Sequence, residues 1–190
     1  MKLAFIDTET TGLDQQTSVV LEFAAIVVDD GVEVARYETK IKPTDQELQY
    51  AHPKALEVNG YTDEAWADAP TIEQVAPDIV ALLNGCTLVG HNVSFDEGML
   101  KAHFAAYGIE GRIPYHKIDT VTLAYEHLTP IGLKSASLDR IREFLGWSKD
   151  GAHTALKDVE DTRQLFNLLW QMTPERQADL AAMLAGEREG

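Results

Sequence analysis

Two carboxylates at the end of an apolar segment are the first sign of chemistry in this sequence. Residues 3–6 are apolar, Asp7 and Glu9 follow one residue apart, and Gly12 marks a turn directly behind them. In a strand, residues two apart share a face, so the two carboxylates can converge on one point. Such charges repel unless a cation lies between them, and oxygen ligands suit a divalent metal ion. We therefore expect a metal-binding pair at a strand end, where active sites of α/β sheets gather.

The Asp-x-Glu pattern alone is weak, because it starts at three positions: Asp7, Asp45 and Asp158. Asp45 and Glu47 follow Pro43 in a polar stretch with no apolar strand before them, and we interpret them as part of a solvated loop. The metal-binding role of Asp7 and Glu9 therefore depends on their position at a strand end and on further residues that could complete the site.

A second group of polar residues follows the short apolar segment 87–89. It reads His91-Asn92-Val93-Ser94-Phe95-Asp96 and leads into a helix. Asp96 falls in the first turn, where the helix dipole favours a carboxylate, so a capping role is the alternative to a ligand role. Phe95 either packs in the core or stacks on a base.

A third pair lies near the end of the chain, where His153 precedes Asp158 by five residues. His153 follows Gly151 on a loop, and an imidazole that titrates near neutrality suits a general base. Asp158 then falls in the first turn of a long helix. Its alternative is an exposed helix acid.

Four carboxylates on one centre require strong positive charge between them. Two divalent cations that clamp the attacking and leaving oxygens of a phosphoryl displacement supply it, and hard oxygen ligands favour Mg²⁺ or Mn²⁺ over zinc. The remaining histidines lack a zinc-type Cys/His spacing, and we expect surface positions or local hydrogen bonds for them: His52, His103, His116 and His127.

The element pattern predicts three strands followed by alternating helices and short strands. The strands are expected over 2–7, 19–28, 32–42, 87–89 and near 118. The helices are expected over 72–83, 94–107, 137–145 and 155–172, with a short helix near 53–58 and an amphipathic tail after Pro174. This order indicates an α/β fold with a mixed sheet, three antiparallel strands then parallel strands, flanked by helices on both faces.

Composition limits the function classes. The 190-residue chain carries a formal net charge of −15, much of it within 44–78, which argues against tight non-specific duplex binding but not against a nuclease that reaches phosphates through metal ions. No apolar run approaches the roughly 20 residues of a membrane span, and we expect no signal peptide, because the first expected strand begins at residue 2. The single Cys86, expected to be buried, points to a reducing, cytoplasmic setting.

In order along the chain, the three motifs resemble those of the DnaQ-like (DEDDh) 3′–5′ exonucleases, within the ribonuclease-H-like superfamily. The resemblance rests on residues 5–13, on His91-Asn92-x-x-Phe95-Asp96 and on His153-x-x-x-x-Asp158, with softer matches at 59–62 and 118–120. It covers about residues 3 to 170. A histidine five residues before the last aspartate is typical of the histidine branch, whereas relatives often have His-Gly where this chain has Asn59-Gly60.

The resemblance implies a ribonuclease-H-like fold and removal of 5′-mononucleotides from single-stranded DNA 3′ ends, as in proofreading or repair. Two Mg²⁺ or Mn²⁺ ions would be held by Asp7, Glu9, Asp96 and Asp158, and His153 would take the proton from the attacking water. The terminal nucleotide would contact a set of substrate-binding residues: Thr10, Thr11, Gly12, Leu13, Asn92 and Phe95. For Leu13 a plain core position is the alternative.

Two other functions stay open. The same chemistry on RNA or short oligonucleotides is one, because sensing a 2′-hydroxyl depends on pocket details. A non-catalytic module that binds a partner such as a DNA polymerase is the other, although no carboxylate or histidine of the motifs is missing. We expect an exonuclease domain over 1–173, a short helical tail over 174–190 and no membrane partner.

Overall fold

The centre of the protein is a five-stranded sheet in the order β3-β2-β1-β4-β5. The computed structural model describes residues 1–189, with side chains described up to residue 186, so Gly190 of the expected tail lies outside the described residues. The strands are β1 (Lys2–Thr10), β2 (Val20–Asp29), β3 (Val32–Lys40), β4 (Thr87–Gly90) and β5 (Lys117–Asp119).

Strand directions confirm the expected mixed sheet. β1 pairs antiparallel with β2, where Phe5 lies opposite Ile26, and β2 pairs antiparallel with β3 across the turn at Asp30-Gly31. β4 then joins the other side of β1 in parallel, and β5 pairs in parallel with β4. The carboxyl ends of β1, β4 and β5 therefore lie along one edge.

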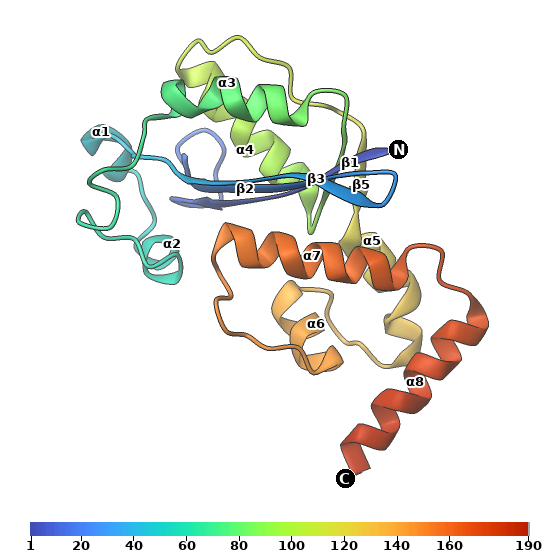
Figure 1. Ribbon diagram of the computed structural model, residues 1–190. Coiled ribbons are helices and arrows are strands. Elements are labelled where there is room, and N and C mark those ends of the chain that lie inside the picture. The colour runs from blue at the N-terminus through green and yellow to red at the C-terminus, as the bar shows by residue number, and fades with distance from the viewer. Residues whose placement is uncertain (190) are drawn as a thin grey trace.

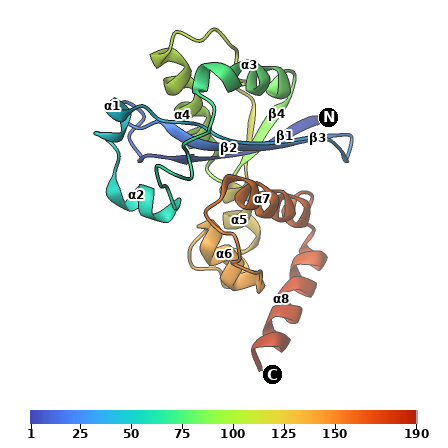
Figure 2. The ribbon, with the colours of Figure 1, turned by 60° about the vertical axis from the view of Figure 1, so that its left-hand side comes forward.

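Helices cover both faces of the sheet, also as expected (Figures 1 and 2). One face carries α3 (Ile72–Leu83) and α4 (Val93–Ala106), and the other carries α5 (Thr120–His127), α6 (Leu138–Leu145) and α7 (Ala155–Leu169). The alternation along β1 assigns its two faces. Ala4 and Ile6 join the core under α3 and α4, whereas Leu3 and Phe5 pack against α7.

A third apolar cluster joins α5, α6 and α7 to the last helix, α8 (Pro174–Glu189). Leu180 and Leu184 of α8 are buried in this cluster, and in both views the helix extends away from the sheet (Figures 1 and 2). The tail is thus a helix of 16 residues that is anchored through Leu180 and Leu184 near its middle. Helix α5 and the 3-10 turn η1 (Thr129–Ile131) were not predicted from the sequence.

The segment between β3 and α3 corrects the interpretation of Glu47 as solvated. It contains α1 (Asp45–Leu48) and the expected turn of helix, α2 (Pro53–Val58). The Glu47 carboxylate caps α1 through Thr44 and accepts a hydrogen bond of 2.9 Å from the hydroxyl of Tyr107, the C-cap residue of α4. Glu47 therefore docks this segment on α4.

Of two smaller expectations, one is confirmed and the other is wrong. Cys86 is buried, as predicted. His103 is also buried and accepts a hydrogen bond from the backbone N–H of Val20, 83 residues away, so the expectation of a surface position or a local bond was wrong for it. Across residues 1–189 no helix has the length and apolar character that crossing a bilayer requires.

Candidate active site

The face alternation of β1 directs its two acidic side chains toward α7. Leu3 and Phe5 pack on that helix, and Asp7 and Glu9 continue the same face at the carboxyl end of the strand. Asp158 lies in the first turn of α7, which begins beside this strand end. The fold thus brings together two motifs that are about 150 residues apart in sequence.

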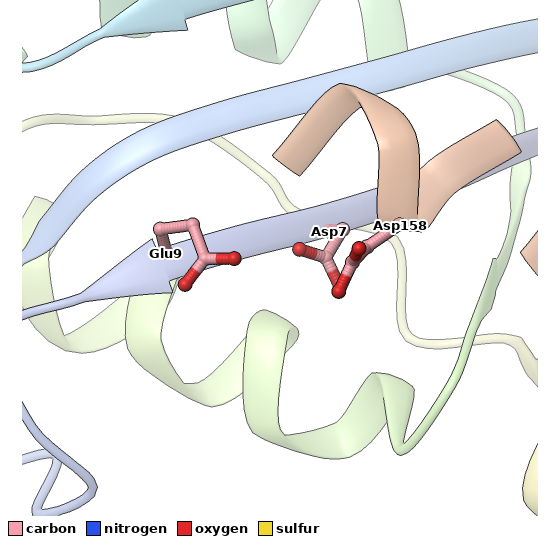
Figure 3. Close-up of side chains that lie close together, drawn as sticks. All are labelled: Asp7, Glu9 and Asp158. Carbon is pink, nitrogen blue, oxygen red and sulfur yellow. The ribbon is translucent and has the colours of Figure 1, made fainter. Parts of the chain in front are cut away.

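Three carboxylates meet at this point (Figure 3). Asp7, Glu9 and Asp158 each offer an oxygen, and these oxygens lie within 4.8 Å of one another. Such spacing allows one divalent cation to bridge all three, and carboxylate oxygens are the ligands that hard cations prefer. The residues present therefore fit a divalent metal ion.

The electrostatics of the three groups support this conclusion. Burial and the neighbouring charges of Asp96, Asp158 and Glu9 raise the pKa of Asp7 well above its usual range. Burial, with a contribution from Asp158, raises the pKa of Glu9 to about 8. The pKa of Asp158 is also raised by burial, although the nearby Arg142 guanidinium opposes the shift. Protons or cations must offset this concentration of negative charge.

Asp96 enters the site from the opposite face of β1. It lies in the first turn of α4, is buried, and accepts hydrogen bonds from the backbone N–H of Thr8 at 2.9 Å and from its hydroxyl at 2.7 Å. Burial raises the pKa of Asp96 to about 7. Asp96 is outside the group of three close oxygens, but its negative charge helps to raise the pKa of Asp7.

His153 lies beside Asp158, one residue before the N-cap of α7. Its side chain is 45% exposed, and its backbone adopts a left-handed φ of 67°. The backbone N–H donates to Asp158 Oδ1 over 3.3 Å, and the ring Nε2 lies 3.5 Å from Asp139 Oδ2. The imidazole is thus accessible to solvent and next to a carboxylate that can orient it.

A cavity of about 620 Å³ opens beside the carboxylates. Its walls include Glu9 and four of the predicted substrate-binding residues, namely Thr10, Gly12, Leu13 and Phe95. Leu13 is 85% exposed, so it is not a core residue. Most of the exposed wall surface is apolar, although many of the lining residues are polar, and apolar surface suits a flat base more than a phosphate.

Thr11 and Asn92 are not brought to the cavity wall. Thr11 is buried and bonds to Val19 through its backbone N–H and its hydroxyl, which fixes the turn after β1. Asn92 is exposed in a left-handed conformation with φ of 73°, and its backbone N–H donates to Asp119. Both residues shape the site from outside the cavity.

Sequence reasoning missed the opposite wall of the cavity. Tyr50, His52, Val58 and Asn59 line it from the acidic segment between β3 and α3, and the side-chain amide of Asn59 donates to the carbonyl of Thr10. Only the soft pattern at Asn59-Gly60 pointed to this segment. Tyr50 carries no local signal that could have identified it.

Comparison with known proteins places this site in context. The model of a family described as exonuclease matches residues 4–166. The chain is 35% identical over 162 residues to a PolC-type DNA polymerase III of Thermotoga petrophila, a match that covers 85% of this chain and 11% of that protein. It is 32% identical over 163 residues to a DNA polymerase III subunit epsilon of Aquifex aeolicus, covering 85% and 76% of the two chains.

Solved structures of exonucleases also resemble this chain. A zinc-bound complex of E. coli exonuclease I with single-stranded DNA superposes with a TM-score of 0.77 at 26% identity, covering 93% of this chain and 42% of that one. A second exonuclease I structure, with an oligonucleotide, gives a TM-score of 0.75 at 26% identity over 98% of this chain and 43% of that one. The ribonuclease-H-like fold is thereby confirmed, and the chain spans less than half the length of the PolC-type and exonuclease I proteins.

Proposed function

This chain belongs to the exonuclease family, and on that premise we propose that it removes nucleotides one at a time from the 3′ ends of single-stranded DNA, releasing 5′-mononucleotides. The observation that carries the proposal is the meeting of the three carboxylates Asp7, Glu9 and Asp158 beside a cavity that Glu9 helps to line. A base held in that cavity would leave its phosphodiester next to the carboxylates.

We assign the metal-binding role to Asp7, Glu9, Asp96 and Asp158. Together they would hold two divalent cations, Mg²⁺ or Mn²⁺, which supply charge stabilisation to the attacking and leaving oxygens. One relative structure contains zinc, but the all-oxygen donor set here favours the harder ions.

The protein's own residues supply proton transfer and binding. His153 would accept the proton of the attacking water at its accessible imidazole. Thr10, Gly12, Leu13 and Phe95 would hold the terminal nucleotide, while Thr11 fixes their loop and Asn92 begins the helix that presents Phe95.

The relatives support a proposal about partners and location. Exonuclease I is found in complex with single-stranded DNA, and two relatives are a DNA polymerase III subunit epsilon and a PolC-type DNA polymerase III. We propose a DNA polymerase as a partner, a cytoplasmic location, and an exonuclease domain over 1–173 with 174–190 as a helical tail.

Matched substrates test the proposal. Single-stranded DNA and RNA of one sequence, labelled at the 5′ end, are incubated with the protein and Mg²⁺, and the products are resolved by length and identified as 5′-mononucleotides. Shortening of DNA from its 3′ end supports the proposal. Degradation of RNA alone would move the function to the exoribonuclease alternative, and digestion of neither, with Mg²⁺ or Mn²⁺, would favour a non-catalytic module.

A further inference from the structure

Arg142 is a buried charged residue that has no role in the function proposed above. It lies on α6 with its side chain 1% exposed, and all three guanidinium nitrogens donate to carboxylates. The distances are 2.6 Å from Nη2 to Asp158 Oδ1, 2.7 Å from Nε to Asp161 Oδ2 and 2.9 Å from Nη1 to Asp139 Oδ1. Burying an arginine is costly unless it is paired, and here each guanidinium nitrogen has a carboxylate partner.

The contact with Asp161 holds the guanidinium of Arg142 against α7. Asp161 is itself 2% exposed and also pairs with Lys157 one turn earlier on α7. The planar fork of Arg142 is thus held on α7, and its remaining nitrogens can point only where the fork directs them. One of these directions is Asp158.

The contact between Arg142 and Asp158 uses only one of the two carboxylate oxygens of Asp158. Arg142 and the backbone N–H of His153 both bond to Oδ1. Among residues 1–186, no hydrogen-bond donor is recorded on Oδ2. The arginine therefore sets the rotation of the carboxylate and decides which oxygen remains for a cation.

The contact with Asp139 extends the same control to His153. Asp139 accepts from Arg142 at Oδ1, while its Oδ2 lies 3.5 Å from Nε2 of His153. One guanidinium thereby contacts a carboxylate of the metal group directly and the candidate base through a single intervening carboxylate.

We propose that Arg142 is a positioning residue of this site, holding Asp158 directly and His153 through Asp139; the proposal rests on the exonuclease function proposed above. Its importance follows from the sensitivity of such centres to geometry, because a displacement of about 1 Å can lower a rate by roughly 100-fold. The competing explanation is that Arg142 only fastens α6 to α7.

Three variants separate these explanations. Arg142→Met removes the fork, Arg142→Lys keeps a charge without the fork, and Ile141→Val trims the buried neighbour on α6 while leaving every ion pair in place. For each protein, kcat and KM are measured on single-stranded DNA with Mg²⁺ at a temperature where thermal melts show the folded state. The electron paramagnetic resonance spectrum of bound Mn²⁺ at saturation provides a readout that does not depend on turnover.

We expect both Arg142 variants to lose about tenfold or more in kcat, with KM changed by less than about threefold, and to alter the Mn²⁺ spectrum. Ile141→Val should match the wild type in both. Equal kcat and an identical spectrum for Arg142→Met and Ile141→Val would overturn the proposal. If the wild type degrades no DNA, the proposed function fails, and the Mn²⁺ spectrum still decides the role of Arg142.

A fourth variant covers the case in which the Arg142 proteins do not fold. Asp139 is 44% exposed, so Asp139→Asn should leave folding intact while weakening the link to His153. We expect a kcat several-fold lower and an unchanged Mn²⁺ spectrum. Wild-type kcat in this variant would overturn the branch through Asp139.

Discussion

Thr8 donates both its backbone N–H and its hydroxyl to the same oxygen of Asp96, over 2.9 and 2.7 Å. Both groups are buried, and the contact joins the strand that carries Asp7 and Glu9 to the helix that carries Asp96. The position of the fourth carboxylate is therefore set by the middle residue of the Asp-Thr-Glu motif.

Thr8→Val should weaken this attachment while conserving shape. The loss of one hydrogen bond to an ionised group is worth roughly 1.5–3 kcal/mol, so we expect about a tenfold or larger loss in Mg²⁺-dependent kcat. Steady-state kinetics over a range of Mg²⁺ concentrations checks this. Unchanged kinetics would show that the hydroxyl does not position Asp96.

Thr162→Val is the matched control, because it makes the same chemical change where the hydroxyl has no partner. Within residues 1–186, Thr162 Oγ1 is buried without a hydrogen bond, on the side of α7 away from solvent. Removing an unsatisfied buried hydroxyl should stabilise the protein by about 1 kcal/mol and leave kcat unchanged. Thermal unfolding and the same kinetic assay measure both.

The metal-free protein should lose stability as the pH rises toward 8. The pKa of Glu9 is about 8 in the folded protein, against about 4.3 in an unfolded chain, so between these values the folded state binds more protons. Stability falls with pH wherever the folded state holds the extra proton. Melting in EDTA at about pH 6 and about pH 9 should show a lower Tm at the higher pH.

Two comparisons make the pH result specific. Glu9→Gln should make the decrease smaller, because one of the carboxyl groups with a raised pKa is gone, and Mg²⁺ should restore Tm at high pH by compensating the charges. A decrease of the same size in Glu9→Gln would assign the effect to other groups.

Gly12 should tolerate no side chain unless Ser18 is shortened. A Cβ at position 12 would lie 2.7 Å from Ser18 Oγ, closer than contacts allow, and Gly12 lines the cavity. We expect Gly12→Ala to raise KM for single-stranded DNA several-fold through a shift of the turn. Gly12→Ala with Ser18→Ala removes the clashing oxygen and should recover most of the loss. Failure of the double variant to recover would mean that the added methyl itself obstructs the nucleotide.

His153→Ala should lower kcat by about 100-fold or more, the size expected for a lost general base, while Mn²⁺ affinity stays the same. Calorimetric titration with Mn²⁺ measures the affinity. His116→Ala, an exposed histidine at the amino end of β5, is the control and should change neither quantity. A collapse of Mn²⁺ affinity in His153→Ala would make the histidine a ligand.

The motif-bearing elements could be predicted because their signals are local. The apolar run before Asp7, the handover from strand to helix before Asp96 and the turn before Asp158 each define a strand end or a first helical turn. The parallel pairing of β1 with β4 then brings two of these ends together without further information.

The parts that were missed depend on contacts between distant residues. Helix α5 buries only Thr120 and Ala124 within its own length, so it lacks an apolar stripe that would identify it. Glu47 looks like a solvated acid until α4 supplies Tyr107, and the fork of Arg142 has meaning only once α6 lies against α7. No pattern in a single sequence encodes such pairs.

The central claim is that Asp7 and its neighbouring carboxylates hold the metal ions that cleave 3′ ends. Its most direct measurement is the rate of 5′-mononucleotide release from single-stranded DNA with Mg²⁺, for the wild type and for Asp7→Ala, with circular dichroism to verify the fold. We predict 3′-to-5′ shortening by the wild type that EDTA abolishes, and loss of activity in a folded Asp7→Ala protein. Equal rates for the two proteins would contradict the account.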